Sequence, residues 1–153
     1  MGGADAGSAE PVRGVTVIRV DPVAKPRMTR RDVWKKRPSV LAYRAYADTL
    51  RARYAGPLPD EVVIIFTLPM PRSWSARKRD RMRGQPHRAK PDLDNLEKAV
   101  LDALHPRDQE VWRKAGVKIW GDAGSVTIMP WRAEVAAVVA SDHAYGLAAA
   151  FGD

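Results

Sequence analysis

The sequence contains no cysteine among its 153 residues. Disulfide bridges and thiolate zinc sites are therefore excluded, and this composition suits a cytoplasmic protein. No apolar run reaches the roughly 18 residues that a transmembrane helix needs, so we expect no membrane span. The first ten residues also lack the charged and apolar regions of a secretory signal. Together these absences predict a protein that works in the cytoplasm.

Acidic residues are outnumbered, with 18 Asp and Glu against 26 Lys and Arg. The net charge of +8 and the pI of about 10.1 indicate a polyanionic partner. Nucleic acid is the first candidate and an anionic membrane surface the second. The length suits one domain, and the hydrophobic content of 45% is ordinary for a soluble globular protein.

One stretch carries the strongest local signals, and it runs from Lys90 to Leu104 with the sequence KPDLDNLEKAVLDAL. Two carboxylates, Asp92 and Asp94, follow a proline, and apolar residues then recur at helical spacing. Asp92 is suited to cap this helix. Asp94 and Lys98 would lie one turn apart on the face that the apolar stripe leaves free.

Two interpretations of these acids compete. In the first, Asp92 is a helix cap, Asp94 and Lys98 form a surface ion pair, and neither acid has a chemical role. In the second, the acids hold a hard cation such as Mg²⁺, which prefers carboxylate oxygens and substrate phosphates. The basic run just before the helix favours the second interpretation, because a metal held beside a basic surface suits phosphodiester hydrolysis.

The stretch resembles the signature of the RusA-type Holliday junction resolvases, small endodeoxyribonucleases common in phages and prophages. The family pattern is roughly (K/R)-x-D-x-D-N-L-x-K-x-x-x-D-A-L, followed by an Asp-Asp pair before a strand. Segments 25–38, 74–87 and 118–120 resemble the phage branch, and the likeness extends over roughly residues 13–130. It does not cover the two ends.

The resemblance implies a nuclease that uses Mg²⁺, with Mn²⁺ as an alternative. Asp92, Asp94 and a third acid would hold the ion. Asn95 would orient a carboxylate or a water, and Lys98 would face the charge that develops on the phosphate, or steady the acids in the free enzyme.

The third acid has two candidates. When Lys118 is aligned with the lysine that follows the family's Asp-Asp pair, Asp108 falls on the second, catalytic Asp, and Arg107 replaces the first. The alternative, Asp122, would require an insertion, so Asp108 is preferred. Glu110 is either an auxiliary ligand or an ordinary surface residue.

Two segments concentrate the positive charge. Residues 25–37 carry seven basic residues and one acid, and residues 72–90 carry eight and one. Such runs are suited to phosphate contacts. Trp34 would stack on an exposed base or pack into the core, and His87 is an exposed loop residue or a phosphate contact. The residues predicted to contact the DNA backbone are Lys25, Arg27, Arg30, Lys35, Lys36, Arg77, Lys78, Arg88 and Lys90.

The pattern predicts one α+β domain over residues 13–131, with a mixed sheet of about four strands packed with two or three helices. Strands are expected at 13–20, 61–68, near 109–119 and at 125–131. Helices are expected from 38 to about 55, at 76–83 and at 92–104. Residues 1–12 are expected to be a disordered leader, and residues 132–153 a tail with at most a short helix.

The predicted activity is paired cleavage of four-way DNA junctions in recombination and repair. A homodimer is expected from the resemblance, because a two-fold dimer presents two identical sites to two symmetric cut sites. Three alternatives stay open: a nuclease for other branched or flapped DNA, a catalytically inactive junction-binding protein, and a basic domain whose acids only cap a helix.

Overall fold

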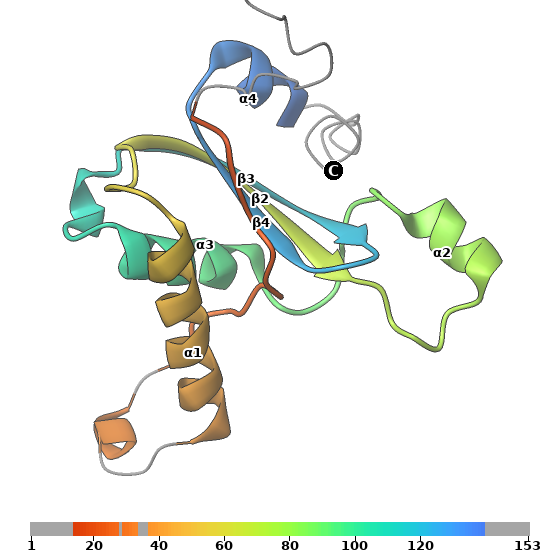
Figure 1. Cartoon of the computed structure of the whole chain (residues 1–153), viewed down its shortest axis with the longest axis horizontal. Coiled ribbons are helices and arrows are strands. Elements are labelled where there is room, and N and C mark those ends of the chain that lie inside the picture. The colour runs from red at the N-terminus through yellow and green to blue at the C-terminus, as the bar shows by residue number, and fades with distance from the viewer. Residues whose placement is uncertain (1–13, 28, 34–36, 140–153) are drawn as a thin grey trace, which may run out of the picture.

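A computed structural model describes residues 14–27, 29–33 and 37–139 of the chain (Figure 1). Its centre is a four-stranded mixed sheet in the order β1-β4-β2-β3. The strands are β1 (Thr16–Ile18), β2 (Glu61–Pro69), β3 (Arg113–Gly121) and β4 (Ser125–Pro130). β2 and β3 are parallel, and both of the other pairings are antiparallel. The α+β prediction is confirmed.

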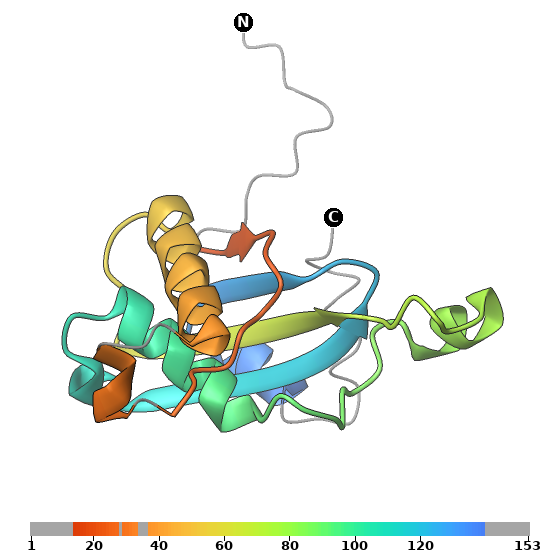
Figure 2. The ribbon, with the colours of Figure 1, turned by 90° about the horizontal axis from the view of Figure 1, so that it is seen from below.

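The longest strand, β2, separates two layers of apolar side chains because successive residues point to opposite faces. Val62, Ile64 and Phe66 pack with the buried residues of α1 (Pro38–Arg53) and α3 (Leu93–Leu104). Val63 and Ile65 belong to a smaller cluster on the other face, which Val135 of α4 (Ala133–Val139) joins. Figure 2 shows α1 and α3 on one side of the sheet and α4 on the other. Both faces of β2 are therefore buried.

The two long helices form where the sequence signals predict them. α1 begins with Pro38 at its first turn, and the helix gives way to Gly56 at a φ of 81°. α3 begins after Asp92 and buries Leu96, Ala99 and Val100. Because α3 connects β2 to the parallel strand β3, it runs back along the sheet. Its first turn therefore lies towards the carboxyl ends of these strands, the edge where α/β units commonly place ligands.

Some boundaries differ from the prediction. Instead of one strand near 109–119, the chain forms a short 3-10 helix, η2 (Asp108–Glu110), before β3 begins. A second 3-10 helix, η1 (Arg30–Val33), occupies part of the first basic segment. A helix, α2 (Ala76–Met82), forms where residues 76–83 were expected to be helical. The predicted leader and most of the predicted tail lie outside the described residues. Among the residues that the structure describes, no helix is long and apolar enough to cross a membrane.

Candidate active site

The first turn of α3 is fixed from two sides. On β3, the Lys118 Nζ donates hydrogen bonds to the carbonyl oxygens of Ala89 and Pro91, the latter at 2.6 Å, and so ties the preceding loop to the sheet. On the other side, the backbone N–H of Lys25 donates to the carbonyl oxygen of Asn95 at 3.1 Å. The acids of this turn therefore stand on a braced element, as a binding site requires.

Asp92 occupies the N-cap position, but its side chain does not cap the helix. Its Oδ1 instead accepts a hydrogen bond from the Lys90 Nζ at 2.6 Å. That hydrogen bond, together with the positive charges of Lys90 and Lys118, lowers the pKa of Asp92. The carboxylate is 47% exposed. Asp92 is therefore ionised at neutral pH and accessible to a ligand.

Asp94 and Lys98 do not form the surface ion pair that the first interpretation required. Both side chains are exposed on α3, and neither has a hydrogen bond or ion pair with any residue that the structure describes. The helix dipole favours a carboxylate in the first turn, where Asp94 lies. Asp94 is therefore available to bind a cation, and Lys98 is available to bind an anionic group such as a phosphate. Asn95, between them and the core, is half-buried.

Lys25 has a structural role as well as a basic side chain. Its Nζ forms an ion pair with Asp102, one turn beyond Lys98 on α3. The prediction that Lys25 contacts DNA stays a prediction, but this lysine is already engaged in holding the first basic segment on α3. Arg27 and Arg30 of the same segment are exposed, and Lys35 and Lys36 lie outside the described residues, as does Trp34.

The structure does not bring the third acid to the first two. Asp108 is in η2, past the opposite end of α3 from Asp92, and a helix of 12 residues is about 18 Å long. Asp122 follows β3 and accepts hydrogen bonds from Arg83 at 2.7 and 3.0 Å. Neither acid joins Asp92 and Asp94 in a group of potential metal ligands among the described residues.

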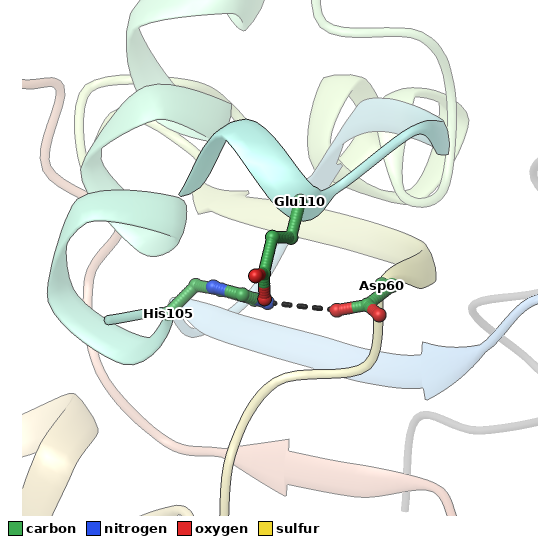
Figure 3. Close-up of side chains that lie close together, drawn as sticks. All are labelled: Asp60, His105 and Glu110. Carbon is green, nitrogen blue, oxygen red and sulfur yellow. Dashed lines mark hydrogen bonds and ion pairs between the residues drawn. The ribbon is translucent and has the colours of Figure 1, made fainter. Parts of the chain in front are cut away.

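A different group places potential metal ligands close together: Asp60, His105 and Glu110 (Figure 3). Their ligand atoms lie within 4.8 Å of one another, and the His105 side chain is buried. The sequence analysis missed this group, because its members come from three segments that only the fold brings together.

The hydrogen bonds around His105 argue against a metal there. The backbone N–H of Arg107 donates to Nδ1 at 3.1 Å, so Nδ1 must be the acceptor and Nε2 carries the proton in the neutral ring. Nε2 then donates to Asp60 at 3.0 Å. A metal on Nε2 would move the proton to Nδ1, against the N–H of Arg107. Glu110 is paired with Arg107 at 3.0 Å. We interpret this group as a structural link between the end of α3 and the start of β2.

The second basic segment forms an arm, defined here as residues 71–90, that carries α2 and projects from the sheet (Figure 1). Of the predicted DNA contacts, Arg77 and Arg88 are exposed on it. Lys78 lies over the Trp74 ring at 4.2 Å, and Lys90 is paired with Asp92. His87, which was expected to be an exposed loop residue or a phosphate contact, is buried against Trp120, with ring centroids 3.9 Å apart.

The comparison with protein families decides the class. The family of the endodeoxyribonuclease RusA matches residues 20–129, which is more than two thirds of the chain. The chain belongs to the RusA family. The match covers β2, β3, all of β4 except Pro130, and the helices α1, α2 and α3, while β1 lies before it. No curated protein matches the chain significantly. The family assigns an endodeoxyribonuclease of the Holliday junction resolvase class, and the acids at the start of α3 are the chemistry in this chain that fits it.

Proposed function

We propose that this RusA family member is a Mg²⁺-dependent nuclease that resolves four-way DNA junctions by paired cleavage, with Mn²⁺ as an alternative ion, in recombination and repair. The observation that carries the proposal is the pair Asp92 and Asp94, two accessible carboxylates on a braced helix start. Mg²⁺ is commonly held by one or two carboxylates together with substrate phosphates, so this donor set fits the ion.

In this proposal each residue of the first α3 turn has a role. Asp92 and Asp94 would hold the ion, which would supply a bound water of lowered pKa and positive charge beside the phosphate. Lys98 supplies positive charge to the phosphate that is being cleaved. Lys90, already beside Asp92, keeps that carboxylate ionised and oriented. Asn95 orients a carboxylate or the attacking water.

The third acid is proposed to come from a second copy of the chain. Asp108 is the preferred match to the family's catalytic acid in the sequence, but it lies past the far end of α3 from Asp92. In a two-fold homodimer, Asp108 of each chain would complete the Asp92 and Asp94 pair of the other. Such a dimer also presents two equivalent sites to the two symmetric strands of a junction.

A cleavage assay tests the activity itself. The purified chain should introduce paired nicks into a labelled four-way junction with Mg²⁺ and should bind the same junction without cutting when Mg²⁺ is removed. Forks, flaps and linear duplex of equal length should be cut more slowly. Equal cutting of flaps and junctions would instead assign a general branched-DNA nuclease.

A second candidate function is junction binding without cleavage. Two points favour it: in the preferred alignment Arg107 takes the place of the first Asp of the family pair, and Asp108 is remote from the other acids within one chain. Junction binding with no Mg²⁺- or Mn²⁺-dependent cutting would support this candidate over the nuclease.

A further inference from the structure

The arm of residues 71–90 is an element that the sheet does not need for its core. It leaves the end of β2 and returns beside β3, and both views show it extending away from the rest of the molecule (Figures 1 and 2). Its helix α2 has no buried residue, although Ser75 caps it by accepting from the backbone N–H of Lys78 at 3.2 Å. A helix without a buried face gains little from core packing, so its position must be set at the base of the arm.

The base of the arm is fixed to β3. The backbone N–H of Gly84 donates to the carbonyl oxygen of Trp120 at 2.8 Å. The backbone N–H of Trp120 in turn donates to the carbonyl oxygen of Gln85 at 3.0 Å. The Trp120 ring contacts His87 and also Trp74, the latter with centroids 4.8 Å apart. This aromatic cluster and these hydrogen bonds make the base rigid while the helix above it stays in solvent.

Asp122, in the turn that follows β3, is paired with two arginines of the arm. Its carboxylate accepts from the Nε and Nη2 of Arg83 at 2.7 and 3.0 Å and lies 3.8 Å from the Arg79 guanidinium. Arg83 also pairs with Asp80 at 3.0 Å. The hydrogen bonds from Arg83 lower the pKa of Asp122, so the pair stays charged. Asp122, the alternative candidate for the third acid, is thus also placed to position the arm.

The cations of the arm separate into two sets. Four are engaged with Trp74, Asp122, Asp80 or Asp92, namely Lys78, Arg79, Arg83 and Lys90. Four others are exposed and have no partner among the residues that the structure describes: Arg72, Arg77, Arg81 and Arg88. The first set builds the arm, and the second set is available to a polyanion.

Two of the available arginines border one open groove. Arg81 and Arg88 line it together with Met82, Pro86 and Gln85. Guanidinium groups match phosphate oxygens, apolar side chains suit the flat face of a base, and an amide can form hydrogen bonds with a base edge. The lining therefore combines the three contacts that one nucleotide offers.

We propose that this groove binds a single unstacked nucleotide of the DNA at the branch point, and that the Asp122–Arg83 pair holds the groove in place. This inference rests on the proposed function for its substrate class. A nucleotide within a duplex has its base faces covered by its neighbours, so only an unpaired or splayed strand can use an apolar groove floor. The groove would therefore favour branched over linear DNA, which charge alone would not.

The test uses a junction with 2-aminopurine at the branch point, in buffer without Mg²⁺ so that nothing is cut. On binding the parent, the fluorescence should rise because the base leaves its stacked neighbours. Arg88→Ala and Arg81→Ala should each remove most of that rise and reduce the preference for junction over duplex by about tenfold, which corresponds to about 1.4 kcal/mol. Arg44→Ala is the control, because Arg44 is equally exposed and unpartnered among the described residues but lies on α1.

The groove is refuted if Arg88→Ala and Arg81→Ala behave as Arg44→Ala does, with small and equal losses on junction and duplex and an unchanged fluorescence rise. Asp122→Asn gives an independent check, because it removes a negative charge. If Asp122 acts only through its charge, its loss should tighten binding to all DNA. If the Asp122–Arg83 pair holds the groove in place, the variant should lose the preference for junctions and the fluorescence rise. Circular dichroism confirms that each variant is folded.

The same samples separate the groove from the nuclease activity. A parent that gives the fluorescence rise but does not cut with Mg²⁺ or Mn²⁺ would refute the nuclease and support the groove. A parent that cuts junctions without any rise would support the nuclease and refute the groove.

Discussion

At the scale of single residues, the carboxylates of this chain differ mainly in what already binds them. Asp102 is held by Lys25, Asp122 by Arg83, and Glu97 by Lys114 at 2.6 Å. Asp94 is exposed and has no partner among the described residues. An unpaired carboxylate at a helix start costs little by itself. The absence of a described partner is what distinguishes Asp94 from these three paired acids.

His87 is predicted to titrate below its ordinary range. Burial, reinforced by the positive charge of Lys118, lowers the pKa of His87 from 6.5. The folded protein therefore takes up this proton less readily than the unfolded chain, so stability should fall as the pH drops from about 6.5 through the lower folded-state pKa. An NMR titration of the His87 ring should give a midpoint under 6.5.

The control for this titration is His87→Gln, in which the loss of unfolding free energy between pH 7 and pH 5.5 should be smaller than in the parent. A midpoint for His87 at or above 6.5 would show that the ring is more exposed to solvent than its packing on Trp120 implies.

The residue positions of the site were largely predictable, and their partners were not. The helical spacing after Pro91 places Asp92 and Asp94 at a helix start, and the structure has them there. Asp92 does not cap α3 because its carboxylate pairs with Lys90, and Asp122 is held by Arg83. The positions of Lys90 and Arg83 are set by the fold of the arm. Contacts between segments far apart in the chain are set by the fold and leave no local pattern in the sequence.

At the scale of elements, the packing of α3 on β3 depends on one glycine. A Cβ built on Gly116 would lie 2.3 Å from the Glu97 Oε1. Glu97 is 9% exposed and is paired with Lys114, so its carboxylate cannot move aside without weakening that pair. The close approach of helix and strand therefore requires the absence of a side chain at residue 116.

Gly116→Ala should lower the free energy of unfolding by about 1–3 kcal/mol, the usual range for overpacking. In a Glu97→Ala background the same substitution should cost less, because the clashing carboxylate is gone. Urea unfolding of the four proteins in this cycle measures the coupling. Additive effects would mean that Glu97 does not occupy the space above Gly116.

The elements themselves followed from the sequence better than their edges did. The β-branched run of β2 and the apolar stripe of α3 predicted their types and approximate bounds correctly. The predicted start of β3 was wrong because Asp108–Glu110 form a 3-10 helix. The residue before this helix, Arg107, donates its backbone N–H to the His105 Nδ1, a contact that no short sequence pattern encodes.

At the scale of the whole molecule, the basic segments should make DNA binding steep in salt. If the two segments contact roughly 6–10 phosphates, the affinity for a junction should fall by about 10³–10⁵ between 50 and 200 mM salt. Anisotropy titrations at several salt concentrations, without Mg²⁺, measure the slope. A nearly flat response would argue against phosphate tracking by residues 25–37 and 72–90.

A mixing experiment tests the proposal that two chains share the acids. Asp94→Asn and Asp108→Asn should each be inactive alone. In a mixed dimer, one site would combine the intact Asp92 and Asp94 of one chain with the intact Asp108 of the other, so Mg²⁺-dependent nicking of one strand should return. If each site lies within one chain, both sites of the mixed dimer stay defective and no activity returns.

The most direct test of the central claim compares the two groups of acids. Asp94→Asn and Glu110→Gln each remove one negative charge, one at the start of α3 and one in the Asp60–His105–Glu110 group. With Mg²⁺, Asp94→Asn should abolish junction cutting while keeping junction binding, and Glu110→Gln should cut within a few-fold of the parent. If Glu110→Gln lost cutting while Asp94→Asn retained it, the active site would lie at the carboxyl end of α3, in the Asp60–His105–Glu110 group. That result would contradict the proposed role of Asp92 and Asp94.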